Sequence, residues 1–137
     1  MTRLLALLAL LLCAASAAAQ QPIRIGELNS YKGFPAFLEP YKKGWTLALE
    51  EINAAGGIGG RKLEGISRDD NGNPGDAVRV AEELASREQV SMLMGGFASN
   101  VGLAISDFAK QRKLPFLAAA RANGVPVLGE VEFASRF

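Results

Sequence analysis

Along residues 23–118, segments with the hydrophobic pattern of a strand alternate with segments that have the pattern of a helix. Short runs rich in apolar residues, typical of buried strands, cover 23–28, 90–94 and 114–118, and residues 62–68 alternate weakly between apolar and polar positions, which also predicts a strand. Between these runs, apolar residues recur three or four positions apart, which predicts three helices that each bury one face. The expected buried stripes are Tyr41, Trp45, Ala48, Leu49 and Ile52; Ala77, Val80, Ala81, Leu84 and Ala85; and Val101, Ala104, Ile105, Phe108 and Ala109. Crossovers of this length predict a parallel sheet with helices on both faces, that is, a three-layer doubly wound α/β fold.

Turn residues mark where these elements begin and end. The segment 29–40, rich in Gly, Pro and aromatic residues, is expected to be a loop. The first helix is expected to stop before Gly56, because glycine can take the left-handed conformation that closes a helix. Asn73 and Pro74 are the expected cap and first position of the second helix. A candidate fifth strand covers 125–128.

The stretch 90–100 is the expected centre of a binding site. An apolar run stops at Gly95 and Gly96, and small and hydroxyl residues then lead into a helical pattern. In such a strand-to-helix turn, the first backbone N–H groups of the helix bind anions without help from a charged side chain. The Ser99 hydroxyl would add a further hydrogen bond. The loops after the first, third and fourth strands should open at the carboxyl edge of the sheet, where ligands bind in such folds.

Residues 1–19 are expected to be a secretory signal peptide, and residues 20–137 the mature chain. Arg3 makes the start positive, an unbroken apolar run follows, and Ala17–Ala19 supply the small residues of a cleavage site. An N-terminal membrane anchor is the alternative, but the run is shorter than the roughly 20 residues of a membrane span. The single cysteine follows a leucine, where a lipid anchor would need a small residue.

The composition excludes several classes of function. Cleavage would leave equal numbers of acidic and basic residues, and a neutral exported chain is a poor candidate for binding nucleic acid or anionic membranes. It would also leave no cysteine, so that the core alone must stabilise the fold. The chain has no histidine to activate Ser99, and no glycine stretch fits a dinucleotide-binding motif. We therefore expect a protein that is not an enzyme and uses no cofactor.

Two stretches resemble a known family. Residues 44–63 read GWTLALEEINAAGGIGGRKL, and the second stretch combines Asp69–Asp70, Asn73–Pro74 and Ala77–Val78. With a first strand that follows the signal peptide, these stretches are similar to the leucine/isoleucine/valine-type periplasmic substrate-binding proteins of ABC transporters. The resemblance covers residues 23–122, nearly the whole mature chain.

The resemblance implies the type I periplasmic-binding fold, in which two lobes close on a ligand. Such proteins are usually more than twice as long as this chain. The chain would therefore be a fragment or truncated product that covers most of the first lobe, with the second lobe missing. The full-length protein is expected to be a periplasmic monomer that delivers an amino acid or related small carboxylate or amide to the permease subunits of an ABC transporter.

The resemblance also assigns ligand-binding residues. Ser99 would take the ligand's α-carboxylate with the N–H groups of the next helix, and Phe97 and Ala98 would line the pocket wall beside it. The alternative for Ser99 is a helix cap, and both roles are compatible. Tyr31 and Phe37, after the first strand, would cover an apolar ligand; ordinary loop packing is their alternative.

The loop after the fourth strand departs from the family pattern. A Ser or Thr often stands there to hold the ligand's carboxylate and ammonium, but residues 118–123 read AAARAN and contain no hydroxyl. Ala120 and Arg121 are the expected contacts here, because the planar guanidinium suits carboxylates. A solvated loop arginine is the alternative for Arg121. The departure leaves a carboxylic acid without an amino group, or an amide, open as the ligand.

Structural roles are expected for three other residues. The spacing of Asp69 and Asp70 is not that of a calcium loop, which favours turn formation and helix capping over a metal site. Trp45 lies on a buried stripe and is expected in the core.

Two other functions remain open: a ligand-sensing domain of a regulator or receptor with the same fold, and an exported doubly wound α/β enzyme.

Overall fold

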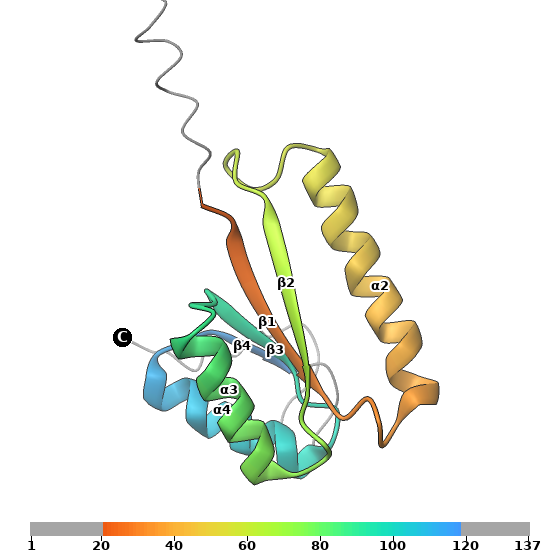
Figure 1. The fold of residues 1–137 in the computed structure, drawn as a ribbon, viewed down its shortest axis with the longest axis vertical. Coiled ribbons are helices and arrows are strands. Elements are labelled where there is room, and N and C mark those ends of the chain that lie inside the picture. The colour runs from red at the N-terminus through yellow and green to blue at the C-terminus, as the bar shows by residue number, and fades with distance from the viewer. Residues whose placement is uncertain (1–20, 119–137) are drawn as a thin grey trace, which may run out of the picture.

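The computed structural model describes residues 21–118, which form a four-stranded parallel sheet with helices on both faces (Figure 1). The elements are β1 (Ile23–Asn29), α2 (Pro35–Ala54), β2 (Leu63–Asp69), α3 (Pro74–Ser86), β3 (Met92–Gly95), α4 (Ser99–Arg112) and β4 (Phe116–Ala118). This order confirms the predicted alternation of strands and helices. The expected signal peptide, the candidate strand 125–128 and the site residues Ala120 and Arg121 lie outside the described residues.

The strand order β2-β1-β3-β4 places a topological switch point between β1 and β3. Helix α2 packs on one face of the sheet, and α3 and α4 pack together on the other (Figure 1). In open sheets of this kind, the ligand crevice lies beyond the carboxyl ends of the strands at the switch point. Those ends are at the lower edge in Figure 1, where Leu28 of β1 lies in register with Gly95 of β3.

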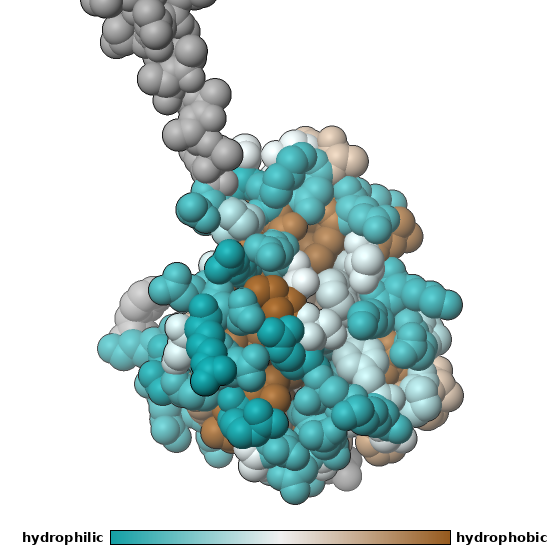
Figure 2. Space-filling model, in the orientation of Figure 1, coloured by the Kyte–Doolittle hydropathy of each residue, from teal (hydrophilic) through white to brown (hydrophobic). Residues whose placement is uncertain are grey.

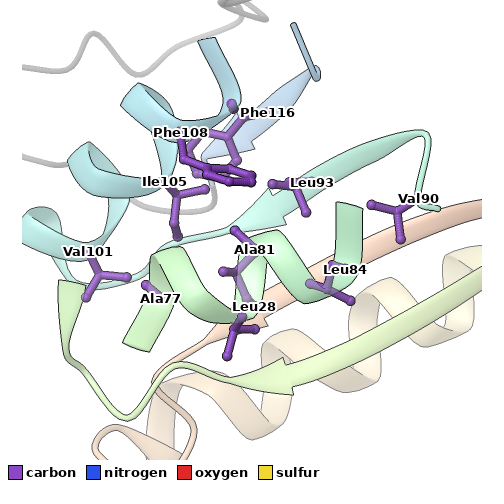
Figure 3. Close-up of a cluster of buried hydrophobic side chains, with 12 residues drawn as sticks. Leu28, Ala77, Ala81, Leu84, Val90, Leu93, Val101, Ile105, Phe108 and Phe116 are labelled. Carbon is purple, nitrogen blue, oxygen red and sulfur yellow. The ribbon is translucent and has the colours of Figure 1, made fainter. Parts of the chain in front are cut away.

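Leu28 and Leu93 lie at the centre of the core, between the sheet and the helices α3 and α4 (Figure 3). The small side chains of Ala77 and Ala81 allow α3 to approach the strands closely. Gly26 leaves no space for a side chain, because a Cβ there would lie 2.9 Å from Leu93 Cδ2. This packing holds β1 and β3 in place, and their carboxyl ends form the candidate site.

Buried residues on α3 and α4 confirm the predicted stripes. Most of the expected positions are fully or almost fully buried, while Ala85 and Ala104 are half-buried. The buried ones are Ala77, Val80, Ala81, Leu84, Val101, Ile105, Phe108 and Ala109. The pattern of the sequence therefore predicted correctly which faces of these two helices meet the sheet.

Helix α2 begins earlier than the sequence predicted. It starts at Pro35, inside the expected loop, and Pro40 lies within the helix. Pro35 occupies the first turn, where a backbone N–H would have no acceptor within the helix, so that its absence costs no hydrogen bond. The fixed φ of proline also suits a helix. Pro40 removes one hydrogen bond further along, and the helix continues through it. The expectation of a loop over 29–40 is therefore wrong for its second half.

Only a narrow stripe of α2 contacts the sheet. Trp45 and Leu49 pack against Gly65 of β2, where a Cβ would lie 2.6 Å and 2.7 Å from their side-chain carbons. Trp45, expected in the core, is only half-buried and does not belong to the core cluster, although it packs on the sheet. Ala48 and Ile52, expected on the buried stripe, are exposed, because α2 lies along the edge strand. In Figure 2, hydrophobic residues reach the surface in a band between α2 and the α3–α4 pair.

The turns follow the predicted chemistry. Asn73 caps α3, because its Oδ1 accepts the N–H groups of Gly75 at 2.8 Å and Asp76 at 3.1 Å. After α2, Gly56 and Gly57 have φ values of +106° and +80°, which favour glycine. Within residues 21–118, none of the helices is long and apolar enough to cross a membrane.

Candidate functional site

The loop between β3 and α4 lies directly against β1. Gly95 and Gly96 have φ values of +123° and +73°, a region that side chains other than glycine rarely adopt. A Cβ at Gly95 would lie 2.0 Å from the carbonyl oxygen of Leu28, and one at Gly96 would lie 3.0 Å from Gly102 Cα. The two glycines therefore allow the backbone to turn from the sheet into α4 in contact with both.

Hydrogen bonds to β1 fix this loop. The N–H of Gly96 donates to the carbonyl oxygen of Leu28 at 2.9 Å, and the N–H of Phe97 donates to Asn29 Oδ1 at 2.9 Å. Both partners belong to the last two residues of β1. The end of β1 therefore holds the start of the loop, and α4 begins at a defined position beyond the switch point.

Among residues 21–118, no side chain caps the N-terminus of α4. Ala98 is the N-cap residue, and the first helical hydrogen bond runs from the N–H of Gly102 to the carbonyl oxygen of Ala98 at 2.8 Å. Ser99 is the first helical residue, so the alternative that Ser99 caps α4 is wrong. The N–H groups of the first turn have no acceptor within the helix and carry its positive end. Phe97, Ala98 and Ser99 are all half-buried, so the turn reaches the surface.

A buried polar cluster supports the site from beneath α2. Asn29 Nδ2 donates to Glu27 Oε1 at 2.6 Å, while its Oδ1 accepts the loop N–H described above. The hydroxyl of Tyr31 also donates to Glu27 Oε1 at 2.9 Å, and the Ser67 hydroxyl donates to Oε2 at 2.7 Å. Glu27 and Asn29 are fully buried. A chain of hydrogen bonds therefore runs from Glu27 through Asn29 to the backbone of Phe97.

Burial raises the pKa of the Glu27 carboxyl above its ordinary value of 4.5. The hydrogen bonds from Ser67, Tyr31 and Asn29, and the charge of Lys42, act in the opposite direction but do not outweigh burial. Burial, followed by the negative charge of Glu27, also raises the pKa of Tyr41. The pKa of Tyr31 rises to about 12, mainly through burial, so its hydroxyl remains a donor at neutral pH.

Replacement of Glu27 by glutamine is expected to raise the melting temperature at neutral pH. The folded pKa lies above the unfolded value, so the ionised carboxyl weakens the fold above the folded pKa, and this loss disappears as the pH falls towards 4.5. Glutamine can accept from Asn29 and Tyr31 and donate to Ser67. The gain in melting temperature of the variant should therefore be largest near neutral pH and shrink as the pH falls.

Melting temperatures of the two proteins between about pH 4.5 and 8 test this expectation. Asp70, whose pKa burial also raises, titrates in both proteins and cancels in the difference. A difference that is constant over this range, or a variant that is less stable at neutral pH, would show that the Glu27 charge does not weaken the fold.

Three phenylalanine rings form a cluster at the same edge. Phe34 precedes α2, Phe37 lies in its first turn, and Phe97 lies in the loop before α4. The Phe97 ring is 5.1 Å from the Phe34 ring at an interplanar angle of 54°, and 5.7 Å from the Phe37 ring at 24°. Two of the predicted contacts, Phe37 and Phe97, therefore meet. Phe34 was not among the predicted contacts; it lies in the same segment 29–40 as Phe37, and no local pattern in the sequence distinguishes the two.

Tyr31 belongs to the buried polar cluster. Its hydroxyl is bonded to Glu27, and the Lys42 ammonium lies 5.2 Å from the centre of its ring. The structure therefore connects Tyr31 to the buried polar cluster, whereas Ser99, Ala98 and Phe97 lie together at the β3–α4 turn.

Asp69 and Asp70 organise the turn after β2. Asp69 accepts the backbone N–H groups of Lys32 at 3.0 Å and Asn71 at 2.7 Å. Asp70 is fully buried, and its Oδ1 accepts from the Ser30 hydroxyl at 2.6 Å and the Gly72 N–H at 2.9 Å. These bonds confirm the expected turn chemistry and join the ends of β1 and β2.

Known proteins share the sequence pattern and the fold of this chain. Residues 22–133 match the family model described as periplasmic binding protein. The Leu/Ile/Val-binding protein homolog 7 of Brucella melitensis is 34% identical over 114 residues, which are 82% of this chain and 28% of that protein. An amino acid binding protein of Pseudomonas aeruginosa is 37% identical over 84 residues, which are 61% of this chain and 22% of that protein.

A solved structure shares the fold. The branched-chain amino acid transporter substrate binding protein LivJ of Streptococcus pneumoniae, in complex with isoleucine, is similar with a TM-score of 0.70 and 30% sequence identity. The similarity covers 75% of this chain and 30% of that one, so the chain spans less than a third of the length of these relatives. The family match, the sequence identity and the doubly wound sheet agree: the chain belongs to the periplasmic binding proteins.

Proposed function

We propose that this chain carries the ligand-receiving edge of an extracytoplasmic solute-binding protein. The protein would take up an amino acid or a related small carboxylate or amide and deliver it to the permease of an ABC transporter, without chemical change. The observation that carries this proposal is the N-terminus of α4 at the switch point, which no side chain of the described residues caps and which the end of β1 holds in place. The similar S. pneumoniae protein was solved with isoleucine, a ligand of the proposed class.

In this proposal, the carboxylate of the ligand lies at the start of α4. The Ser99 hydroxyl and the first N–H groups of the helix donate to it, because their dipoles converge on this point. Ala98, Phe97 and Phe37 line the wall for the apolar part of the ligand. Arg121, with Ala120 beside it, supplies a second contact to an acidic group.

The proposal extends to location and assembly. Residues 1–19 would direct the chain out of the cytoplasm and be removed. The full-length protein would work as a monomer in the periplasm, where a second lobe closes over the ligand. Selectivity then depends on both lobes, and this chain supplies the carboxylate end of the site.

Replacement of Ser99 by alanine in the complete gene product tests the site. A thermal-shift screen against amino acids, amides and small organic acids identifies a ligand, and calorimetry measures its affinity. Loss of one hydrogen bond to a charged group predicts affinity lower by about tenfold or more. Ser106→Ala, two turns further along α4, is the matched control and should bind normally. Unchanged affinity in Ser99→Ala would refute the proposed carboxylate site, and turnover of the ligand would refute the receptor function.

Residues 20–137 expressed alone are expected to bind any such ligand weakly or to aggregate. The described residues supply one side of the proposed cleft, and a surface that normally meets a second lobe would be open to water. Calorimetry and light scattering on this segment, beside the complete gene product, give the comparison. Equally tight binding by both proteins would show that the chain forms a whole site by itself.

A further inference from the structure

We infer that the preferred ligand of this edge is a small aromatic carboxylate without an amino group, an inference that rests on the proposed function of the same site. The phenylalanine cluster, Phe34, Phe37 and Phe97, carries it. The rings belong to two segments far apart in the sequence, yet they stack at the edge where the carboxylate would bind. The cluster therefore lies where the apolar part of the ligand must lie.

Two rings of the cluster remain accessible. Phe37 is 66% exposed and Phe34 is 40% exposed, while Phe97 is half-buried between them. Aromatic side chains left open at a sheet edge beside convergent polar groups are typical of a ligand site. Aromatic rings prefer offset-stacked and tilted contacts, and these contacts add to the effect of burial alone. A ligand ring placed on the cluster would gain both, whereas an aliphatic side chain would gain only burial.

The spacing along the chain limits the shape of the ligand. Phe97 precedes Ser99 by two residues, which span at most about 7 Å of extended backbone. The start of α4 and the cluster are therefore close together, which favours a ligand whose carboxylate is joined to its ring directly or through one carbon. Benzoate and phenylacetate meet this condition.

The site offers little to an ammonium group. The carboxylates at the ends of β1 and β2 are either engaged or buried. Asp69 accepts two backbone N–H groups and Glu27 accepts three side-chain donors. Asp70 accepts a hydroxyl and an N–H at Oδ1, while its buried Oδ2 has no partner among the described residues. Glu27 and Asp70 are fully buried, so an ammonium group at the surface of this edge does not reach either carboxylate. The segment 118–123 contains no hydroxyl that would bind an ammonium.

Calorimetry on the complete gene product with four probes tests the inference. Benzoate and cyclohexanecarboxylate have nearly the same size and charge but differ in aromaticity; phenylacetate adds one carbon, and leucine adds an ammonium group. Benzoate or phenylacetate should bind about three- to tenfold more tightly than cyclohexanecarboxylate, and more tightly than leucine. This comparison needs no variant, so it holds whatever a substitution does to folding.

The variant Phe37→Leu separates stacking from burial. Because Phe37 is largely exposed, the fold should tolerate leucine, and circular dichroism checks this. The variant should lose most of the preference for the aromatic probe and keep its affinity for cyclohexanecarboxylate. Leu47→Ala is the control, since Leu47 is exposed on the same helix about 15 Å further along. It should leave the preference unchanged.

The outcomes separate the two claims. Leucine binding more tightly than both aromatic acids, or an equal affinity for benzoate and cyclohexanecarboxylate, would overturn the aromatic preference and leave the receptor function standing. Loss of the preference in Leu47→Ala as well would also overturn it, because the effect would not come from the cluster. If no probe bound and no ligand from the wider screen depended on Ser99, the proposed function itself would fail.

Discussion

Replacement of Gly95 by alanine is expected to lower the stability by about 3 kcal/mol or more and to abolish ligand binding. The added Cβ would lie 2.0 Å from the carbonyl oxygen of Leu28, a contact that no rotamer can relieve. Leu28 belongs to β1, which is paired on both sides, so its backbone cannot move away. The φ value of +123° adds backbone strain for any residue with a side chain.

The effect on binding follows from what the loop holds. A shift of Gly95 would break the hydrogen bond from the Gly96 N–H to Leu28 and move the start of α4 away from the switch point. Melting temperature and ligand calorimetry on the complete gene product measure both effects.

Gly59→Ala is the matched control for Gly95→Ala. Gly59 also has a positive φ, of +58°, but a Cβ there would meet nothing within 4 Å. Gly59→Ala introduces the backbone strain without the steric clash, so this variant should lose about 1–2 kcal/mol of stability and bind ligand normally. A Gly95→Ala protein that is as stable as Gly59→Ala and still binds would show that the loop is not held against β1 as the structure has it.

Much of the fold could be predicted because the signals for it are local. Strand runs, helical periods and turn residues can each be recognised within a few positions of the sequence. Turn residues lie at the ends of elements as expected in three places: at Asn73, at Gly56 and at the Gly95–Gly96 pair. Parallel pairing then followed from the length of the crossovers. The same argument located the β3–α4 turn at the carboxyl edge, beside the end of β1.

The errors have physical causes. Pro35 and Pro40 suggested a loop, yet one proline fits the first turn of a helix and the other removes a single hydrogen bond from a helix that packs along β2. Serine favours the N-cap position, but the helix begins one residue earlier than that preference implies, with Ala98 as the cap. Boundary errors of one residue are small for the fold, but here the difference frees the Ser99 hydroxyl from the role of a cap.

The buried polar cluster could not be predicted from sequence. Glu27 lies within the strand run 23–28, and nothing in that run marks its side chain as buried. Its burial depends on Ser67, which is 40 residues away, and on α2 covering it. No local pattern connects these residues. The link from Glu27 through Asn29 to Phe97 is therefore visible only in three dimensions, although it positions the predicted ligand loop.

Replacement of Asn29 by alanine is expected to lower the stability by about 2–4 kcal/mol and to weaken ligand binding more than tenfold. The variant loses the acceptor for the Phe97 N–H and one of the three donors to Glu27, and it leaves both groups without these partners in a buried region. The loop would then be held to β1 only through Gly96. Unfolding and calorimetry on the complete gene product measure the two losses.

A second variant separates the contributions that the two hydrogen bonds of Asn29 make to this loss of stability. Asn29→Asp keeps an acceptor for the Phe97 N–H but replaces the donor to Glu27 with a second carboxyl group 2.6 Å from the first. Two carboxylates this close raise the pKa of one of them, so this variant should be least stable at neutral pH and recover as the pH falls. Combining it with Glu27→Gln should remove most of the pH dependence, since glutamine can donate to the new carboxylate. If Asn29→Asp were as stable as the native protein at neutral pH, or if its loss were the same at pH 5, the hydrogen bond between Asn29 and Glu27 would not account for the stability lost in Asn29→Ala.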